Sequence, residues 1–150
     1  MHNKIFDPHK STIGDLDANL IALIAYIGIG AFSFISGLSY IAFAIPLIIF
    51  FLEKESEFVK FHAMQATVLG VINSVLYFII YVIIRGILIN PLNLYAGIAA
   101  FLTFSTIMTI ISIIIAVFAV IAAIAAYGYK GYNIPIVGGF AEKFAEKFKK

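Results

Sequence analysis

Residues 18–52 read ANLIALIAYIGIGAFSFISGLSYIAFAIPLIIFFL and contain no charged side chain. As one straight helix this stretch would be about 52 Å long, whereas the hydrocarbon core of a bilayer is about 30 Å thick. We therefore expect the stretch to break within residues 33–37, which are rich in Ser and Gly. This gives two short spans, near residues 18–33 and 38–52, and Pro46 is expected to kink the second.

The composition of the whole chain places it in a membrane. Of its 150 residues, 63% are hydrophobic and 12% are charged, against about 45–50% and about 25% in soluble domains. A chain this small could not hide so much apolar surface from water. A soluble enzyme, a nucleic-acid-binding domain and a disordered tail are therefore excluded. The absence of Cys also excludes disulfides and thiolate metal sites.

Two further apolar stretches follow a polar connector at residues 53–60. They predict a third span over about residues 62–84 and a fourth over about 98–127, separated by a turn marked by Asn90, Pro91 and Asn93. At the C-terminus, Phe140, Phe144 and Phe148 recur every four residues with Glu and Lys between them, which predicts an amphipathic interfacial helix.

The expected fold is therefore all-α: a polytopic membrane protein with four transmembrane helices and a C-terminal amphipathic interfacial helix. Its parts are a cytoplasmic N-terminal lead (residues 1–17), the four-helix transmembrane domain (18–127) and a cytoplasmic or interfacial segment (128–150).

The positions of the basic residues agree with four spans. With four spans both termini and the 53–61 connector share one side of the membrane. Arg85 alone lies on the other side, which makes the first side cytoplasmic by the positive-inside rule. The basic residues expected on the cytoplasmic side are Lys4, Lys10, Lys54, Lys60, Lys130, Lys143, Lys147, Lys149 and Lys150.

One face of the third span carries most of its polar groups. His62, Ala66, Gly70, Asn73, Tyr77 and Tyr81 fall within about 100° of one another on a helix. The Asn73 amide requires a partner in hydrocarbon, either a Ser or Thr of the fourth span or a substrate in a polar groove. Arg85, at the far boundary, either extends its charge to the membrane surface or has a functional role.

The fourth span presents a narrow face of small residues. Such a face lets helix backbones approach closely in lipid, so a packing surface is expected, with a hydroxyl-lined conduit as the alternative. Its members are Ser105, Thr109, Ser112, Ala116, Ala119 and Ala123.

The chain shows no pattern of an enzyme. All Asp and Glu residues lie outside the expected spans, and no metalloprotease, nucleophile-elbow or phosphate-binding-loop motif is present. We therefore expect no catalytic residue, no metal and no cofactor.

Three sequence features together resemble a known family. The end of the second span at Pro46-Leu-Ile, the charged turn after it, and Phe58-Val-Lys-Phe-His-Ala-Met-Gln-Ala66 resemble the core of a widespread prokaryotic membrane family of unknown function. The exit Tyr127-Gly-Tyr-Lys-Gly-Tyr-Asn-Ile-Pro135 also resembles that family's ending. The twenty-kilodalton membrane subunit of the chloroplast inner-envelope protein translocon (Tic) is similar. The resemblance covers about residues 20–142, but Lys60 replaces the commoner Arg and Glu57 stands where Pro is frequent.

The resemblance implies a four-helix membrane subunit, with a place in a translocation or insertion assembly. We therefore expect a non-enzymatic, multi-pass scaffold or translocon-type subunit of the cell membrane. Its partners would be the lipid bilayer and other membrane proteins or copies of itself, and not nucleic acid. The alternative is a small oligomeric channel or permease lined by Asn73, Tyr77, Thr109 and Ser112. The candidate partner or substrate contacts are Lys60, Phe61, His62, Gln65, Asn73, Tyr77 and Arg85.

Overall fold

The computed structural model describes residues 4–33, 38–88 and 94–147, and these are mostly helical. The break expected at residues 33–37, the turn at Asn90, Pro91 and Asn93, and Phe148 lie largely or wholly outside the described residues. The elements are β1 (Lys4–Ile5), α1 (Ala18–Ser33), the 3-10 helix η1 (Leu38–Ile41), α2 (Ala44–Leu52), α3 (Glu57–Leu88), α4 (Leu94–Tyr127), β2 (Lys130–Gly131) and α5 (Val137–Lys147).

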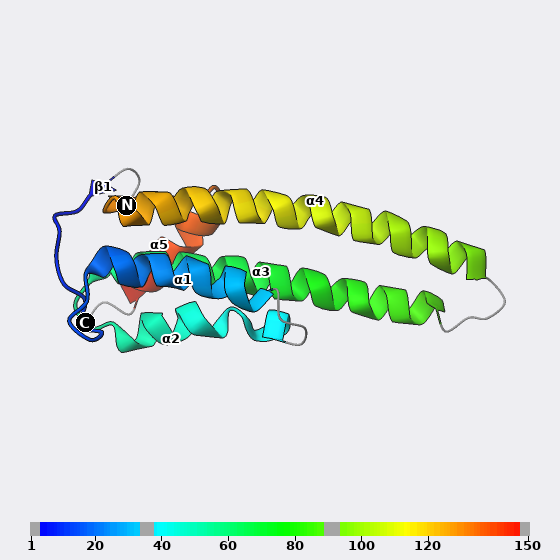
Figure 1. Ribbon diagram of the computed structural model, residues 1–150, viewed down its shortest axis with the longest axis horizontal. Helices are drawn as coiled ribbons and strands as arrows, with labels where there is room; N and C mark the ends of the chain where they lie inside the picture. The colour runs from blue at the N-terminus through cyan, green and yellow to red at the C-terminus, as the bar shows by residue number, and fades with distance from the viewer. Residues whose placement is uncertain (1–3, 34–37, 89–93, 148–150) are drawn as a thin grey trace.

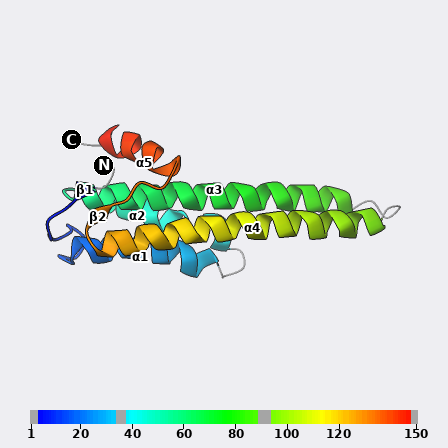
Figure 2. The same cartoon turned by 90° about the horizontal axis from the view of Figure 1, so that it is seen from above.

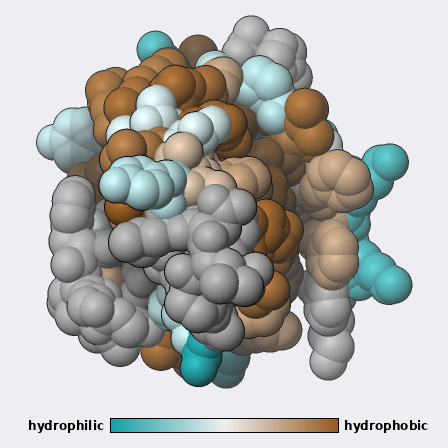
Figure 3. Space-filling view, turned by 90° about the vertical axis from the view of Figure 1, so that its right-hand side faces the viewer, coloured by the Kyte–Doolittle hydropathy of each residue, from teal (hydrophilic) through white to brown (hydrophobic). Residues whose placement is uncertain are grey.

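Two long helices, α3 and α4, run side by side along the whole molecule (Figures 1 and 2). With 32 and 34 residues they are about 48 and 51 Å long. The segments Glu57–Gly86 and Tyr95–Tyr127 are long and apolar enough to cross a membrane. Seen from the far end, apolar side chains cover much of the described surface (Figure 3).

The first two helices are much shorter than the long pair. α1 has 16 residues and α2 has nine. Together with η1 they lie along only the half of α3 and α4 that is nearer the termini (Figure 1). The prediction of four transmembrane helices therefore holds only in part: the described structure has two helices of membrane-crossing length and a short helical hairpin beside them.

Pro46 has a different role from the one expected. It does not kink a long second span, because the chain there forms η1 and then a separate helix, α2. Pro46 is the third residue of α2. In the first turn of a helix the missing N–H of proline has no intrahelical partner in any case.

The end of the molecule near the termini is closed by the N-terminal lead. β1 pairs antiparallel with β2, so that Lys4 lies opposite Gly131 and Ile5 opposite Lys130. Lys10 pairs with Asp17 at 2.8 Å in an exposed ion pair. Residues 4–17 are therefore folded against the helices, whereas the sequence predicted only a short aqueous lead.

Gly70 allows a close approach between α3 and the hairpin. A Cβ atom at this position would lie 2.8 Å from Cβ and 2.9 Å from Cα of Phe43, which precedes α2. Because Cα belongs to the backbone, the contact cannot be relieved by a side-chain rotation alone. The absence of a side chain at Gly70 thus sets the distance between α3 and the hairpin.

We expect Gly70→Ala to lower the free energy of unfolding by about 1–3 kcal/mol, because the added methyl group overpacks this contact. The measurement is reversible unfolding in mixed micelles, followed by circular dichroism. Gly86→Ala is the matched control on the same helix, since a Cβ there meets nothing within 4 Å. Equal stability of the two variants would contradict the close approach.

Candidate functional site

The first turns of α3 are the most enclosed part of the described chain. Every side chain from Phe58 to Thr67 is buried except that of Lys60, which is half-buried. α3 contacts α1, α2, α4, β2 and α5. Farther along, from Val71, many side chains of α3 are exposed. The polar residues of the early turns are thus surrounded by protein.

A cluster of three buried side chains, Tyr26, His62 and Gln65, joins α1 to α3. The Tyr26 hydroxyl lies 3.0 Å from Nδ1 of His62 and 3.0 Å from Nε2 of Gln65. Nε2 of His62 lies 3.1 Å from the carbonyl oxygen of Lys130. Because a carbonyl only accepts, Nε2 carries the proton, and Nδ1 accepts the hydrogen bond from Tyr26. The Gln65 amide then donates to the Tyr26 oxygen, so every member has a partner.

Gln65 also binds the segment that follows β2. Its Nε2 donates to the carbonyl oxygen of Tyr132 at 3.1 Å, and its Oε1 accepts from the backbone N–H of Ile134 at 3.2 Å. One amide side chain therefore replaces the missing backbone partners of an irregular segment lying along α3. Buried backbone groups require such partners, so Gln65 helps to hold the chain between α4 and α5 against α3.

A second buried polar group is the carboxylate of Glu53, in the turn between α2 and α3. It accepts hydrogen bonds from the hydroxyls of Ser11 and Thr12 and from the backbone N–H groups of Lys54, Glu55 and Ser56, the last at 3.0 Å. Burial alone would raise the pKa of Glu53. The hydrogen bonds, led by those from Ser11 and from the Ser56 N–H, outweigh it and hold the pKa below its usual value.

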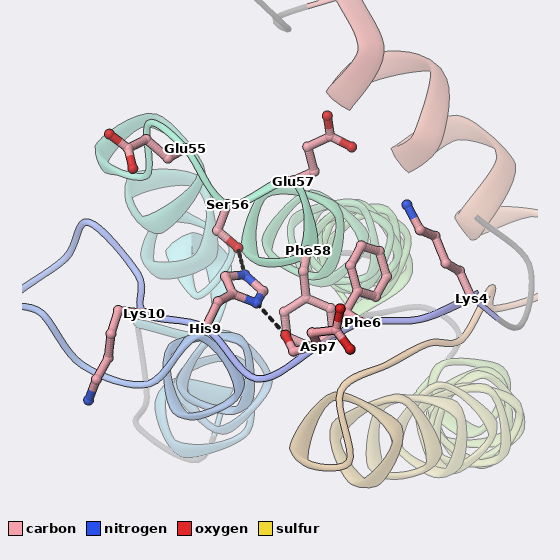
Figure 4. Close-up of a pocket in the computed structure, with 9 residues that line it drawn as sticks. All are labelled: Lys4, Phe6, Asp7, His9, Lys10, Glu55, Ser56, Glu57 and Phe58. Carbon is pink, nitrogen blue, oxygen red and sulfur yellow. Dashed lines mark hydrogen bonds between the residues drawn. The ribbon is translucent and has the colours of Figure 1, made fainter.

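His9 attaches the lead to the start of α3. Its Nδ1 donates to the carbonyl oxygen of Asp7 at 2.8 Å, so its Nε2 accepts from the Ser56 hydroxyl at 2.7 Å. The Ser56 oxygen in turn accepts from the N–H of Val59 at 3.1 Å and thereby caps α3. These residues border an open pocket of about 540 Å³ (Figure 4), lined by Lys4, Phe6, Asp7, His9, Lys10, Glu55, Ser56, Glu57 and Phe58.

The predicted contact residues separate into two groups. Phe61, His62 and Gln65 are fully buried, so they contact other residues of the same chain and not a partner. Lys60 donates to the carbonyl oxygen of Lys54 at 2.9 Å. A partner could reach the buried three only by displacing the chain's own segments.

The other candidates lie farther along α3. Asn73 is half-buried, and Tyr77 is 43% exposed. Arg85 is exposed and donates to the Tyr81 hydroxyl at 2.7 Å. The structure therefore does not bring Asn73, Tyr77 or Arg85 together with the Tyr26–His62–Gln65 cluster.

The small-residue face of α4 is rotated by about one residue, or about 100°, from the face that packs inward. The residues of α4 that pack on the core are Ile115, Phe118, Ala122 and Ala126, together with Ala119 and Ala123 at the border of the small-residue face. Thr109 and Ala116 are exposed, whereas the other predicted members are half-buried: Ser105, Ser112, Ala119 and Ala123.

Four hydroxyls of α4 bond within their own helix, those of Thr103, Ser105, Thr106 and Thr109. Thr109, for example, donates to the carbonyl oxygen of Ser105 at 2.9 Å, and Thr103 donates to that of Ala99. The hydrogen bond expected between Asn73 and a Ser or Thr of this helix is therefore not among those of the described residues.

Sequence reasoning missed the residues that complete the buried polar groups. Tyr26 is a hydroxyl in an otherwise apolar run, and Glu53 is the first charge after 35 uncharged residues. Both features were visible as exceptions to their surroundings. Their partners, His62, Gln65, Ser11 and Thr12, lie 36 to 42 residues away, and no local pattern connects them.

The comparisons with known proteins agree on a prokaryotic membrane family. The profile of the magnetosome magnetite crystal formation protein family matches residues 17–141. A UPF0132 membrane protein of Archaeoglobus fulgidus is 45% identical over 71 residues, an alignment covering 44% of this chain and 63% of that protein. The match thus spans less than two thirds of the relative's length. No solved structure matches the chain.

Proposed function

This protein belongs to the magnetosome magnetite crystal formation protein family, and from that premise we propose that it is a non-enzymatic, multi-pass membrane scaffold that packs against copies of itself or other membrane proteins. One observation carries the proposal. Each polar residue that is fully buried in the described part of the chain bonds to the chain itself, as His62, Gln65 and Glu53 do. The buried polar atoms without a partner are the side-chain oxygens of two half-buried residues, Asn19 and Asn133. The polar interior is thus used to hold the fold together, and the outer surface of the long helices is apolar.

The proposed topology places both termini in the cytoplasm. The two termini and the turn before α3 lie at one end of the long helices, and Arg85 lies near the other (Figure 1). α3 and α4 would cross the membrane, and the shorter α1–α2 hairpin would enter and return from the cytoplasmic side. Because the hairpin begins and ends on the same side of the membrane, both termini are cytoplasmic whether or not the hairpin crosses the whole bilayer. The excess of Lys at this end supports the cytoplasmic assignment.

The small-residue face of α4 is the proposed contact surface. Thr109 and Ala116 lie on it two turns apart, and both are exposed. Small side chains allow a second helix to approach closely, which is the main source of helix association in lipid. The internal packing of the chain uses the neighbouring face together with Ala119 and Ala123, so a partner would meet this face at the exposed Thr109 and Ala116.

We expect Ala116→Cys to form oxidative or bifunctional cross-links in native membranes several-fold more efficiently than Ile114→Cys. The chain contains no Cys, so each variant has a single reactive thiol. Ile114 is the matched control because it is 50% exposed on the other flank of α4. Mass spectrometry of the adducts identifies the partner: copies of the chain or other membrane proteins. Equal, weak cross-linking at both positions would contradict the proposal that this face is a contact surface.

Two narrower functions remain as predictions. A role in protein translocation has support only from the sequence resemblance described above, and adducts of Ala116→Cys with secretory machinery would favour it. A channel or permease would need several copies, since Tyr77 and Thr109 are on the outer surface. The family is named for magnetite crystal formation, and we propose for this chain the membrane-organising part of such a process.

A further inference from the structure

α5 has an apolar row that its own packing does not use. The helix contacts α3 and lies on the side of α3 away from α4 and α1 (Figure 2). Its inner face consists of small side chains: Val137, Gly138 and Ala141 are buried, and Ala145 is half-buried. Its two phenylalanines point elsewhere, since Phe140 is 59% and Phe144 is 51% exposed. Ile136, one turn before Phe140, is 83% exposed.

The order of side chains around α5 is that of a helix at a lipid surface. At 100° per residue, the inner face is followed by Phe140 and Phe144, then by Lys143 and Lys147, and then by Glu142. Both Lys side chains are exposed. The apolar row is thus bordered on one side by protein and on the other by positive charge. An aromatic row next to a Lys row matches the acyl boundary and the headgroups of a bilayer.

We propose that α5 is an anionic-lipid contact of the bilayer in which α3 is embedded: Phe140 and Phe144 enter the acyl boundary, and Lys143 and Lys147 bind acidic headgroups. Two observations select lipid as the occupant. The helix that carries the row packs against α3, whose segment Glu57–Gly86 is long and apolar enough to cross a membrane. The exposed charges that border the row are positive, which complements an acidic leaflet. This inference is independent of the contact surface proposed for α4.

The position of the row is tested with nitroxide labels on the full chain in nanodiscs of phosphatidylcholine and phosphatidylglycerol, with one copy per disc. The labelled variants are Phe144→Cys and, as matched control, Gly139→Cys. Gly139 is exposed on the opposite flank, and a Cβ there meets nothing within 4 Å. We expect oxygen to reach the label at 144 several-fold better than a water-soluble nickel complex does, and the reverse at 139. Phe140→Cys repeats the test if Phe144→Cys does not fold.

Two results would overturn the lipid contact. If the nickel complex reaches both labels equally, the row lies in water. If neither reagent reaches the label at 144, protein covers the row, either another segment of the chain or, when shielding appears only with several copies per disc, a second copy.

The charge part is tested by energy transfer from a dye at Gly139→Cys to headgroup-labelled phosphatidylglycerol or phosphatidylcholine. We expect the acidic lipid to be enriched around the chain, and the double variant Lys143→Gln/Lys147→Gln to abolish the enrichment. Lys54→Gln, which removes one exposed Lys from the turn before α3, should preserve it. Equal transfer to both lipids in the unmodified helix would contradict headgroup recognition.

Discussion

Gln65→Leu is expected to lower the free energy of unfolding by about 2–4 kcal/mol. The substitution keeps the approximate volume of the side chain but removes its hydrogen bonds. The carbonyl of Tyr132 and the N–H of Ile134 would then be buried without a partner, and each such group costs about 1–3 kcal/mol. The Tyr26 hydroxyl is less affected, because it still donates to His62.

The loss of stability in Gln65→Leu should be concentrated in one segment of the chain. We expect backbone amide exchange to accelerate over residues 130–136 in Gln65→Leu before the long helices are affected, because Gln65 holds that segment against α3. The global measurement is unfolding in mixed micelles, and the local one is hydrogen–deuterium exchange by mass spectrometry. Asn73→Leu is the matched control, an amide replaced on the same helix where the side chain is only half-buried. Equal effects of the two variants would show that Gln65 does not hold the exit segment.

Glu53→Gln is expected to lower the free energy of unfolding by about 1–3 kcal/mol, because hydrogen bonds to a charged acceptor are stronger than those to a neutral amide. One Glu53 oxygen receives the Thr12 hydroxyl and three consecutive backbone N–H groups. The three backbone donors lie in the turn before α3, whose helix dipole favours a negative charge. The weakened turn should release the N-terminal lead first, since Ser11 and Thr12 connect the lead to Glu53.

The contribution of Glu53 depends on pH in a defined direction. Its pKa is lowered in the folded protein, so folding favours the ionised form. The stabilisation is therefore fully present above the pKa of the unfolded chain, about 4.3. It is lost as the pH falls below that value and through the lower pKa of the folded state. Above about pH 5 we expect the contribution of Glu53 to the free energy of unfolding to be independent of pH.

Limited proteolysis of residues 4–17 and unfolding in mixed micelles, both as a function of pH, measure these effects. Acid should release the lead of the unmodified chain, whereas Glu53→Gln should show weaker attachment at neutral pH and a smaller change below about pH 4.3. Glu55→Gln is the matched control, an exposed carboxylate two residues away in the same turn. A pH profile unaltered by Glu53→Gln would assign the acid sensitivity to another group.

Local patterns predicted the helices well and their lengths less well. The apolar runs predicted the two long helices, and the spacing of Phe140 and Phe144 predicted α5. Helix α3 nevertheless begins at Glu57, inside the expected polar connector, because Ser56 caps it and Glu53 binds the N–H groups of the turn. Hydropathy records which residues avoid water, and it is insensitive to the caps that decide where a helix starts.

Composition and hydropathy alone were sufficient to predict that this chain belongs in a membrane, that it is helical, and that its basic residues gather at one end. These properties depend on composition and on the period of a helix, which each segment carries alone. The partners of the polar residues, in contrast, became known only from the way the helices pack. Residues 58–66 appeared to offer His62 and Gln65 to a partner, but the fold places them against residues 130–134 and Tyr26. A buried polar group forms its hydrogen bonds with whichever donor or acceptor the packing brings close to it. The packing depends on the lengths of several helices and on close approaches between them, such as that of Gly70 to Phe43. No single segment of the sequence encodes these distances.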